Sequence, residues 1–266
     1  MITRSHCHDH PTKATQQRQD NVAGNTPLTW PAQPQMLRQR RRMIIHQLIR
    51  LHFDYEKNAH AFFELQALDA IRWLRRGGVE IGEETAVLDL GCGFGYLGRT
   101  CAELGARVTY GDVEDLRMDE VAAAPFRQID LNTADLGAVG EYDLVLCSNV
   151  LEHLAEPGHL LANMPALLKP GGVFYLSWTN WLSPWGGHEF SPWHYFGKRS
   201  GPIHTVGKNL FKTYIGDVIR EVRAQDGLQI QRTAPRYYNE FEFLTTLPVV
   251  REFLTWNCAM QIFRSE

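Results

Sequence analysis

The sequence is poor in the features that would place it in a membrane, outside a reducing compartment or on a nucleic acid. No apolar run approaches the ~20 residues needed to cross a bilayer, and the first residues lack the apolar stretch of a signal peptide. Cysteine is scarce, with five residues among 266, an odd number that favours reduced thiols and a cytoplasmic location. The formal net charge of -3 provides no excess of positive charge for binding nucleic acid.

What is present indicates one large α/β domain with additions. The hydrophobic fraction of 44% is sufficient for a sizeable core. We expect a disordered polar tail over residues 1–35, a helical lid over residues 36–80 and the main domain over residues 81–266, with an insertion at residues 179–208. The tail contains His6-Cys7-His8-Asp9-His10, but consecutive ligands on such a tail are typical of an adventitious site, so no physiological metal is expected.

Strand and helix patterns alternate from residue 85 onward. Short apolar runs separated by helical spacing predict a doubly wound, mainly parallel, Rossmann-like sheet of seven strands with helices on both faces. The expected strands cover residues 86–90, 107–110, 126–129, 142–147, 173–178, 228–231 and 258–263. Residues 239–255 are expected to be helical, with an interruption at Pro248.

Two helical stretches precede this domain. The first begins with the basic run Arg38-Gln-Arg-Arg-Arg42, which we interpret as a solvated helix end, with contact to anionic lipid or RNA as the alternative. The second ends at Gly77-Gly78. Its apolar spacing predicts a lid over the cofactor cleft in residues 55–75, with Tyr55, Asn58 and Phe62 near the ligand.

A glycine-rich loop follows the first expected strand. Gly91, Gly93 and Gly95 precede a helix, a setting in which the backbone can approach a nucleotide-type cofactor. The loop also fits the dinucleotide pattern G-x-G-x-x-G from Gly93, with Asp112 lying 19 residues further on. However, the pattern fails when it starts at the strand end, because Tyr96 occupies the third glycine position.

Asp89 also argues against a dinucleotide. It lies at the end of the strand beside the loop. A carboxylate there would repel a pyrophosphate but suits the ammonium group of a methionine moiety.

Residues 87–97, Val-Leu-Asp-Leu-Gly-Cys-Gly-Phe-Gly-Tyr-Leu, resemble motif I of class I S-adenosylmethionine-dependent methyltransferases. The resemblance continues in order through residues 108–112, 128–131, 142–154 and 168–175. It implies an S-adenosyl-L-methionine cofactor, with ribose held at the end of the second strand and adenine at the end of the third. The implied cofactor-binding residues are Asp89, Gly91, Gly93, Phe94, Gly95, Asp112, Val113, Asp130, Leu131 and Asn149.

One position departs from the family pattern. The residue before the acidic end of the second strand is usually hydrophobic, and here it is Gly111. The departure weakens the ribose assignment at Asp112, for which Glu114 is the substitute.

The methyl acceptor is expected to be a small molecule. The loop after the fourth strand, Ser148-Asn-Val-Leu151, lacks the Asn/Asp-Pro-Pro-aromatic motif of enzymes that methylate adenine or glutamine. The insertion at residues 179–208 follows the fifth strand, near the edge at which α/β sheets bind ligands. Its aromatic side chains could line an acceptor pocket or only plug the core.

Three histidines are candidates for a catalytic base that removes a proton from the acceptor. They are His153, His188 and His194. A purely structural hydrogen bond is the alternative for His153, and Glu152 is interpreted as a helix-start residue. The acceptor atom is a hydroxyl oxygen, a nitrogen or an activated carbon. The partners expected are a small-molecule acceptor and possible further copies of the chain, with neither nucleic acid nor stable membrane insertion. The alternative functions are an NAD-dependent oxidoreductase and a non-catalytic scaffold of the same fold.

Overall fold

The computed structural model describes residues 46–47, 50–51, 55–188, 191, 193–195 and 210–265. The chain divides into two compact units, residues 1–66 and residues 67–266. In the first unit, the described residues are helical and include the first part of helix α4 (Tyr55–Arg76). The expected tail at residues 1–35 and the basic run beginning at Arg38 lie outside the described residues. Among the described helices, none is both long and apolar enough to cross a membrane.

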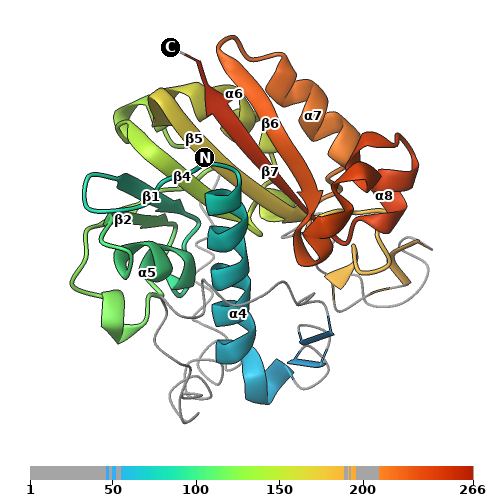
Figure 1. Ribbon diagram of the computed structural model, residues 1–266, viewed down its shortest axis with the longest axis horizontal. Helices are drawn as coiled ribbons and strands as arrows, with labels where there is room; N and C mark the ends of the chain where they lie inside the picture. The colour runs from blue at the N-terminus through green and yellow to red at the C-terminus, as the bar shows by residue number, and fades with distance from the viewer. Residues whose placement is uncertain are drawn as a thin grey trace, which may run out of the picture. The chain divides into compact units, whose positions relative to one another are not determined.

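The second unit is built on a single seven-stranded sheet with the strand order β3-β2-β1-β4-β5-β7-β6 (Figure 1). Strands β1 to β5 pair in parallel, and β7 lies antiparallel to both β5 and β6. The predicted mostly parallel, Rossmann-like sheet is therefore confirmed. The strands are β1 (Ala86–Leu90), β2 (Arg107–Asp112), β3 (Phe126–Gln128), β4 (Tyr142–Ser148), β5 (Leu168–Thr179), β6 (Leu228–Pro235) and β7 (Asn257–Arg264).

Helices cover both faces of this sheet, because successive strand residues point to opposite sides. Leu88 and its neighbours on one face pack with α6 (Pro157–Leu167) and α7 (Ile215–Arg223). Val87 and its neighbours on the other face pack with α5 (Tyr96–Ala102) and with the part of α4 that belongs to this unit. The sheet is thus buried on both sides, which is typical of strands that are nearly continuous apolar runs.

The C-terminal elements follow the predicted pattern with shifted boundaries. The 3-10 segment η6 (Arg236–Thr246) and helix α8 (Val250–Leu254) lie on either side of Pro248, as expected. The preceding helix, α7, begins at Ile215. The glycines at 171 and 172 were expected to precede the fifth strand, but they lie within β5, where Gly171 has a φ of 78°.

The sheet brings the sequence motifs to one edge. The strand order changes direction between β1 and β4, which are adjacent parallel strands whose connections leave on opposite sides. Such a switch point opens a crevice at the carboxyl ends of the strands. The glycine loop after β1 and the turn after β4 both begin at this point.

Candidate active site

The loop between β1 and α5 has the backbone conformation that its glycines predict. Gly91, Gly93 and Gly95 have φ values of 70°, 49° and 84°, a region that side chains disfavour. The surroundings of the three glycines differ. A Cβ on Gly91 would lie 2.3 Å from Cγ2 of Val150, and one on Gly95 would lie 3.1 Å from the Tyr110 ring. A Cβ on Gly93 would meet no atom within 4 Å, so only this glycine borders open space into which a ligand can approach the backbone.

Asp89 lies beneath this loop as a buried carboxylate. Its side chain is 3% exposed, and its Oδ2 atom accepts a hydrogen bond of 2.8 Å from the backbone N–H of Gly98. Burial raises the pKa of Asp89 to about 7, although the Gly98 hydrogen bond lowers it and the charge of Asp112 raises it further. The fold therefore maintains a carboxylate that lacks a full positive partner, and a bound cationic group would stabilise its ionised form.

Asp112 ends β2 with its carboxylate turned toward the glycine loop. Oδ2 accepts a 2.8 Å hydrogen bond from the N–H of Gly93, and Oδ1 accepts one of 2.7 Å from the N–H of Val113. A carboxylate has about four acceptor positions, so capacity remains for the two hydroxyls of a ribose. The substitute, Glu114, is exposed.

The structure also explains the glycine before Asp112. A Cβ on Gly111 would lie 2.8 Å from Cδ1 of Ile129 and 3.5 Å from Cδ1 of Leu90. These two side chains occupy the space that a hydrophobic side chain at position 111 would otherwise fill. The glycine therefore departs from the family pattern because Ile129 and Leu90 fill the core at this point.

The remaining cofactor candidates lie after β2, β3 and β4. Val113 is 54% exposed, and Leu131 is buried beside the exposed Asp130. Asp130 accepts hydrogen bonds from Asn132, and the bond from the Asn132 backbone is the main reason that its pKa is lowered. Asn149 has a φ of 56° and its Oδ1 atom accepts a 2.7 Å hydrogen bond from the side chain of Asn257. Phe94 is half-buried within the glycine loop.

Next to the cofactor loop, the turn after β4 holds a buried acid. Glu152 lies in the 3-10 segment η3 (Leu151–His153) and is 1% exposed. Its Oε1 atom accepts a 2.9 Å hydrogen bond from the N–H of Thr179 at the end of β5. The Oε2 atom is buried and has no hydrogen-bond partner among the described residues. Glu152 lies in the first turn of η3, in agreement with its interpretation as a helix-start residue. Its carboxylate is turned inward against the neighbouring strand.

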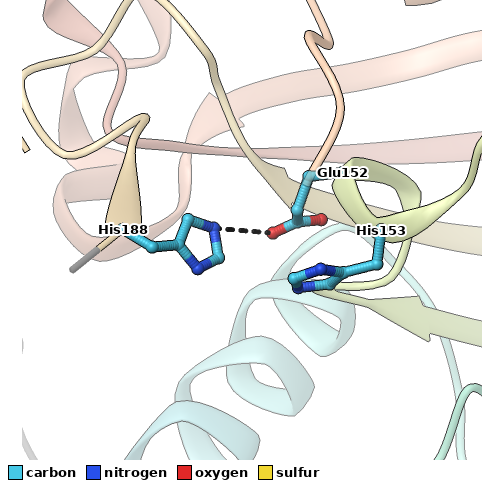
Figure 2. Close-up of side chains that lie close together, drawn as sticks. All are labelled: Glu152, His153 and His188. Carbon is cyan, nitrogen blue, oxygen red and sulfur yellow. Dashed lines mark ion pairs between the residues drawn. The ribbon is translucent and has the colours of Figure 1, made fainter. Parts of the chain in front are cut away.

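Two of the predicted histidines meet at this carboxylate. His188 Nε2 lies 3.9 Å from Glu152 Oε1, and the rings of His153 and His188 lie edge to face with centroids 5.4 Å apart. Figure 2 shows the two imidazoles on either side of the carboxylate. Both histidines are exposed, whereas Glu152 is buried. We name Glu152, His153 and His188 the acid–histidine cluster.

The third predicted histidine has other partners. His194 is 3% exposed, and its Nε2 atom lies 3.1 Å from the carbonyl oxygen of Trp181. Burial lowers the pKa of His194, so the ring is neutral near pH 7. Its imidazole packs against the Trp181 ring at a centroid distance of 5.2 Å. These contacts are those of a residue that stabilises the loop.

The tryptophans of the insertion also differ in their surroundings. Trp181 is 6% exposed, whereas Trp185 is 39% and Trp193 is 59% exposed. Trp185 stacks on Trp256 with a centroid distance of 4.4 Å. Gly186 is required because a Cβ there would lie 1.9 Å from the Trp181 carbonyl oxygen. The Gly186-Gly187 turn thus carries the chain back from the buried Trp181 to His188.

Arg236 is a buried cation that the sequence did not reveal. It is 2% exposed, and its Nη1 atom donates hydrogen bonds of 2.9 Å to Ser148 and 3.3 Å to Ser177. Burial alone would lower its pKa, but the tyrosines and acids around it, Glu152 among them, raise it. Arg236 therefore contributes a fixed positive charge behind the acid–histidine cluster. It begins η6, a segment whose sequence carries no motif.

The sheet and its loops together define a class of protein. The strand order places β7 antiparallel between β5 and β6, a glycine loop follows β1, and β2 ends in an acidic residue. These three features are those of class I S-adenosylmethionine-dependent methyltransferases. The open space at Gly93 and the buried Asp89 carboxylate fit the methionine part of that cofactor.

Comparison with known proteins leads to the same family. Residues 88–174 match a family described as a methyltransferase domain. An uncharacterized methyltransferase of Mycobacteroides abscessus is 34% identical over 78% of this chain and 89% of its own length. Another, from Mycobacterium avium, is 33% identical over 83% of this chain and 96% of its own length. The chain belongs to this methyltransferase family and uses S-adenosylmethionine, which sets aside NAD-dependent oxidoreduction.

Solved structures share the fold. A methyltransferase from Mesorhizobium loti that depends on S-adenosylmethionine superposes with a TM-score of 0.53, at 18% identity, over 74% of this chain and 98% of that chain. Magnesium protoporphyrin IX methyltransferase from Synechocystis, solved with bound S-adenosylhomocysteine, superposes with a TM-score of 0.52, at 20% identity, over 88% of this chain and 93% of that chain.

Proposed function

We propose that this methyltransferase transfers the methyl group of S-adenosylmethionine to a hydroxyl of a small-molecule acceptor, which is activated at the acid–histidine cluster. One observation carries the proposal. The turn that holds Glu152 and His153 starts at Val150, and the Val150 side chain lies where a Cβ of Gly91 in the cofactor loop would be. Glu152 and His153 therefore follow directly from the point at which the β4 turn contacts the cofactor loop, and His188 reaches Glu152 from the loop after β5.

The cofactor assignments follow from the geometry of the carboxyl edge. We assign the methionine ammonium to the region of Asp89 and Gly93, and the ribose hydroxyls to Asp112. The adenine is assigned to Val113, Asp130 and Leu131. Phe94, Gly95 and Asn149 complete the surroundings. In this arrangement the sulfonium lies toward the turn after β4, since the loops after β1 and β4 are in contact.

The reaction is an in-line displacement. The acceptor oxygen forms a bond to the methyl carbon, the carbon–sulfur bond breaks, and sulfur retains the electron pair as neutral S-adenosylhomocysteine. Alignment supplies much of the rate enhancement. A hydroxyl must also lose its proton, and the cluster promotes this loss. In the simplest form the imidazole of His153 or His188 takes the proton.

The proposal of a small acceptor is supported by exposed aromatic side chains in the insertion after β5. The exposed rings of Trp185 and Trp193 belong to the same insertion as His188, and aromatic side chains commonly line small-molecule sites. We narrow the proposed catalytic histidines to His153 and His188, because His194 is buried against Trp181.

The experiment is a turnover assay with matched variants. The full chain is incubated with S-adenosylmethionine and a fractionated extract of small metabolites, and S-adenosylhomocysteine is measured. The product is identified by its gain of one methylene in mass. His153→Ala and His188→Ala should each lower turnover roughly a hundredfold or more while cofactor affinity is retained.

His159→Ala serves as the control. His159 lies in α6 and contacts the Ala134 carbonyl oxygen through Nε2, so this variant should keep its turnover. If both cluster variants were as active as wild type, the acceptor would not be activated at this cluster, and a nitrogen or activated carbon aligned by proximity alone would replace the hydroxyl in the proposal.

A further inference from the structure

The acid–histidine cluster has the composition of a metal site as well as that of a proton acceptor. Its three side chains each offer one ligand atom, and all three atoms lie within 4.8 Å of one another. They come from two segments, the turn after β4 and the loop after β5, which Figure 2 shows converging on a common space. Two imidazole nitrogens and one carboxylate oxygen are a donor set that suits a divalent transition metal.

One carboxylate oxygen of Glu152 is buried without a hydrogen bond from the described residues. This atom is Oε2, whereas Oε1 accepts a hydrogen bond from the Thr179 N–H. A buried carboxylate oxygen without a hydrogen bond is costly, and in native structures such an atom commonly signals an unplaced water or ion. The charge of Glu152 is among those that raise the pKa of Arg236, and Arg236 Nη1 donates hydrogen bonds to Ser148 and Ser177.

The backbone at His188 gives independent support. His188 has a φ of 52°, one of three positive values at non-glycine residues in the described part of the chain. Such conformations are uncommon and cluster at ligand sites. Here the conformation follows the Gly186-Gly187 turn and directs the imidazole to Glu152, 3.9 Å away.

We propose that Glu152, His153 and His188 bind a divalent transition-metal ion of the Zn²⁺ type. This inference rests on the proposed function and specifies how the cluster activates the acceptor. The buried carboxylate and the two exposed imidazoles give three protein ligands. The fourth position faces the exposed side, as in catalytic zinc sites that leave one position open to water or substrate.

Only small movements are needed to form the site. Zinc–ligand bonds of about 2.0–2.2 Å require the ligand atoms to lie somewhat closer together than the 4.8 Å within which they lie here. Glu152 is fixed by its hydrogen bond to Thr179, and the two exposed imidazoles close on it by side-chain rotation.

The acceptor hydroxyl then takes the open position. A bound Zn²⁺ ion lowers the pKa of an oxygen ligand steeply, to about 7 for water. The hydroxyl releases its proton to solvent, its oxygen attacks the methyl carbon, and the ion stabilises the oxygen before transfer. In this form the imidazoles act as ligands, and no imidazole has to accept the proton.

Metal titration of the full chain tests the inference. The protein is treated with a chelator, dialysed, and titrated by calorimetry with ZnCl2 and separately with MgCl2. Co²⁺ provides a second readout, because its visible absorption reports coordination by imidazole. Glu152→Gln retains an oxygen for the Thr179 N–H, and His188→Ala changes an exposed side chain, so both variants should fold.

The N-terminal run His6-Cys7-His8-Asp9-His10 supplies further ligands, so a matched control is needed. Replacing His6, His8 and His10 together with alanine should leave one zinc equivalent bound per chain. His188→Ala or Glu152→Gln in that background should weaken this equivalent at least tenfold, and Mg²⁺ should bind far more weakly than Zn²⁺.

The outcomes separate the inference from the proposed function. Zinc binding that is unchanged in His188→Ala and Glu152→Gln, or absent from the tail-substituted protein, overturns the inference. Full turnover after chelation also overturns it, even where His188→Ala is inactive, because the cluster then works without a metal. Full turnover in His153→Ala and His188→Ala instead overturns the proposed function itself.

Discussion

At the scale of single residues, Asp89 combines a negative charge with complete burial. Its pKa is raised to about 7, mainly by burial, from about 3.9 in an unfolded chain. The folded protein therefore disfavours the ionised form. This penalty is absent below about pH 3.9, grows as the pH rises, and is complete above about pH 7. A residue that costs stability in the free protein is expected to be retained for binding.

Asp89→Asn should separate these two effects. Asparagine keeps an oxygen for the Gly98 N–H and carries no charge. In the cofactor-free protein at pH 8 the variant should be more stable than wild type by at most about 4 kcal/mol, because the pKa of Asp89 is raised by about three units and each unit is worth about 1.4 kcal/mol. Its affinity for S-adenosylmethionine should fall at least tenfold through loss of a charged partner. Urea unfolding and calorimetry measure the two quantities.

The same residue predicts a pH dependence of binding. A cationic cofactor favours ionised Asp89, so wild-type affinity should increase as the pH rises to about 7, and Asp89→Asn should lack this increase. Asp112 faces Asp89 and helps to raise its pKa. The nearby Cys92, Cys101, Cys147 and Tyr110 have pKa values raised by burial and stay neutral. A wild-type affinity that is constant from pH 5.5 to 7.5 would contradict the assignment.

Residue by residue, the sequence predicts the cofactor loop better than the acceptor side. The pattern formed by Asp89 and the glycines is local in the sequence, because a strand, a tight loop and a helix follow one another directly between Ala86 and Ala102. The inward orientation of the Glu152 carboxylate was not predicted, because it depends on the Thr179 N–H of a neighbouring strand. Arg236 was missed because it is brought into the core by η6, far along the chain. Both depend on tertiary contacts that no local pattern contains.

At the scale of elements, the packing of α5 on β2 depends on Gly98. A Cβ there would lie between 2.4 and 2.9 Å from three atoms of the Tyr110 side chain, two in the ring and the hydroxyl oxygen. Gly98→Ala should therefore force helix and strand apart, destabilising the protein by roughly 1–3 kcal/mol. Because the Gly98 N–H also donates to Asp89, cofactor affinity should fall as well.

Gly158 in α6 is the matched control for this substitution. A Cβ at Gly158 would meet no atom within 4 Å, so Gly158→Ala should be neutral or stabilise by roughly 0.4–1 kcal/mol. Chemical denaturation of both variants provides the comparison. Equal effects of the two substitutions would mean that Gly98 packing does not hold α5 in place.

The expected lid is a second element-scale prediction. Residues 55–75 all lie within α4, and we predict that its first part, with Tyr55, Asn58 and Phe62, covers the cofactor. Hydrogen exchange of peptides from this segment should slow when S-adenosylhomocysteine is added, whereas peptides from α7 should be unaffected. Exchange in residues 55–75 that is indifferent to the ligand would rule out a lid.

Element prediction from the sequence succeeds where periodicity is strong and turns are explicit. The seven strands and their order of appearance follow from short apolar runs. Strand β5 is longer than predicted because Leu168 pairs with Tyr142 ahead of a register shift, which only the partner strand can induce. Antiparallel insertion of β7 between β5 and β6 is likewise a pairing choice, made between segments that are distant in sequence.

At the scale of the whole molecule, the switch point between β1 and β4 brings the cofactor loop next to the turn that carries Glu152 and His153. The end of β1 and the loop after it provide a buried carboxylate and open backbone. The turn after β4 provides the buried Glu152 and His153, and the loop after β5 adds His188. Their contact through Gly91 and Val150 is the basis for placing the acceptor beside the cofactor's methyl group.

A crystal structure of the full chain with S-adenosylhomocysteine tests this account most directly. We predict the homocysteine part at Gly93 and Asp89, the ribose at Asp112, and the sulfur facing the space between His153 and His188. An acceptor atom about 3–3.5 Å from the methyl position would then be within reach of the cluster. A ligand bound elsewhere on the sheet, or one whose sulfur is directed away from Glu152 and the two histidines, would contradict the account.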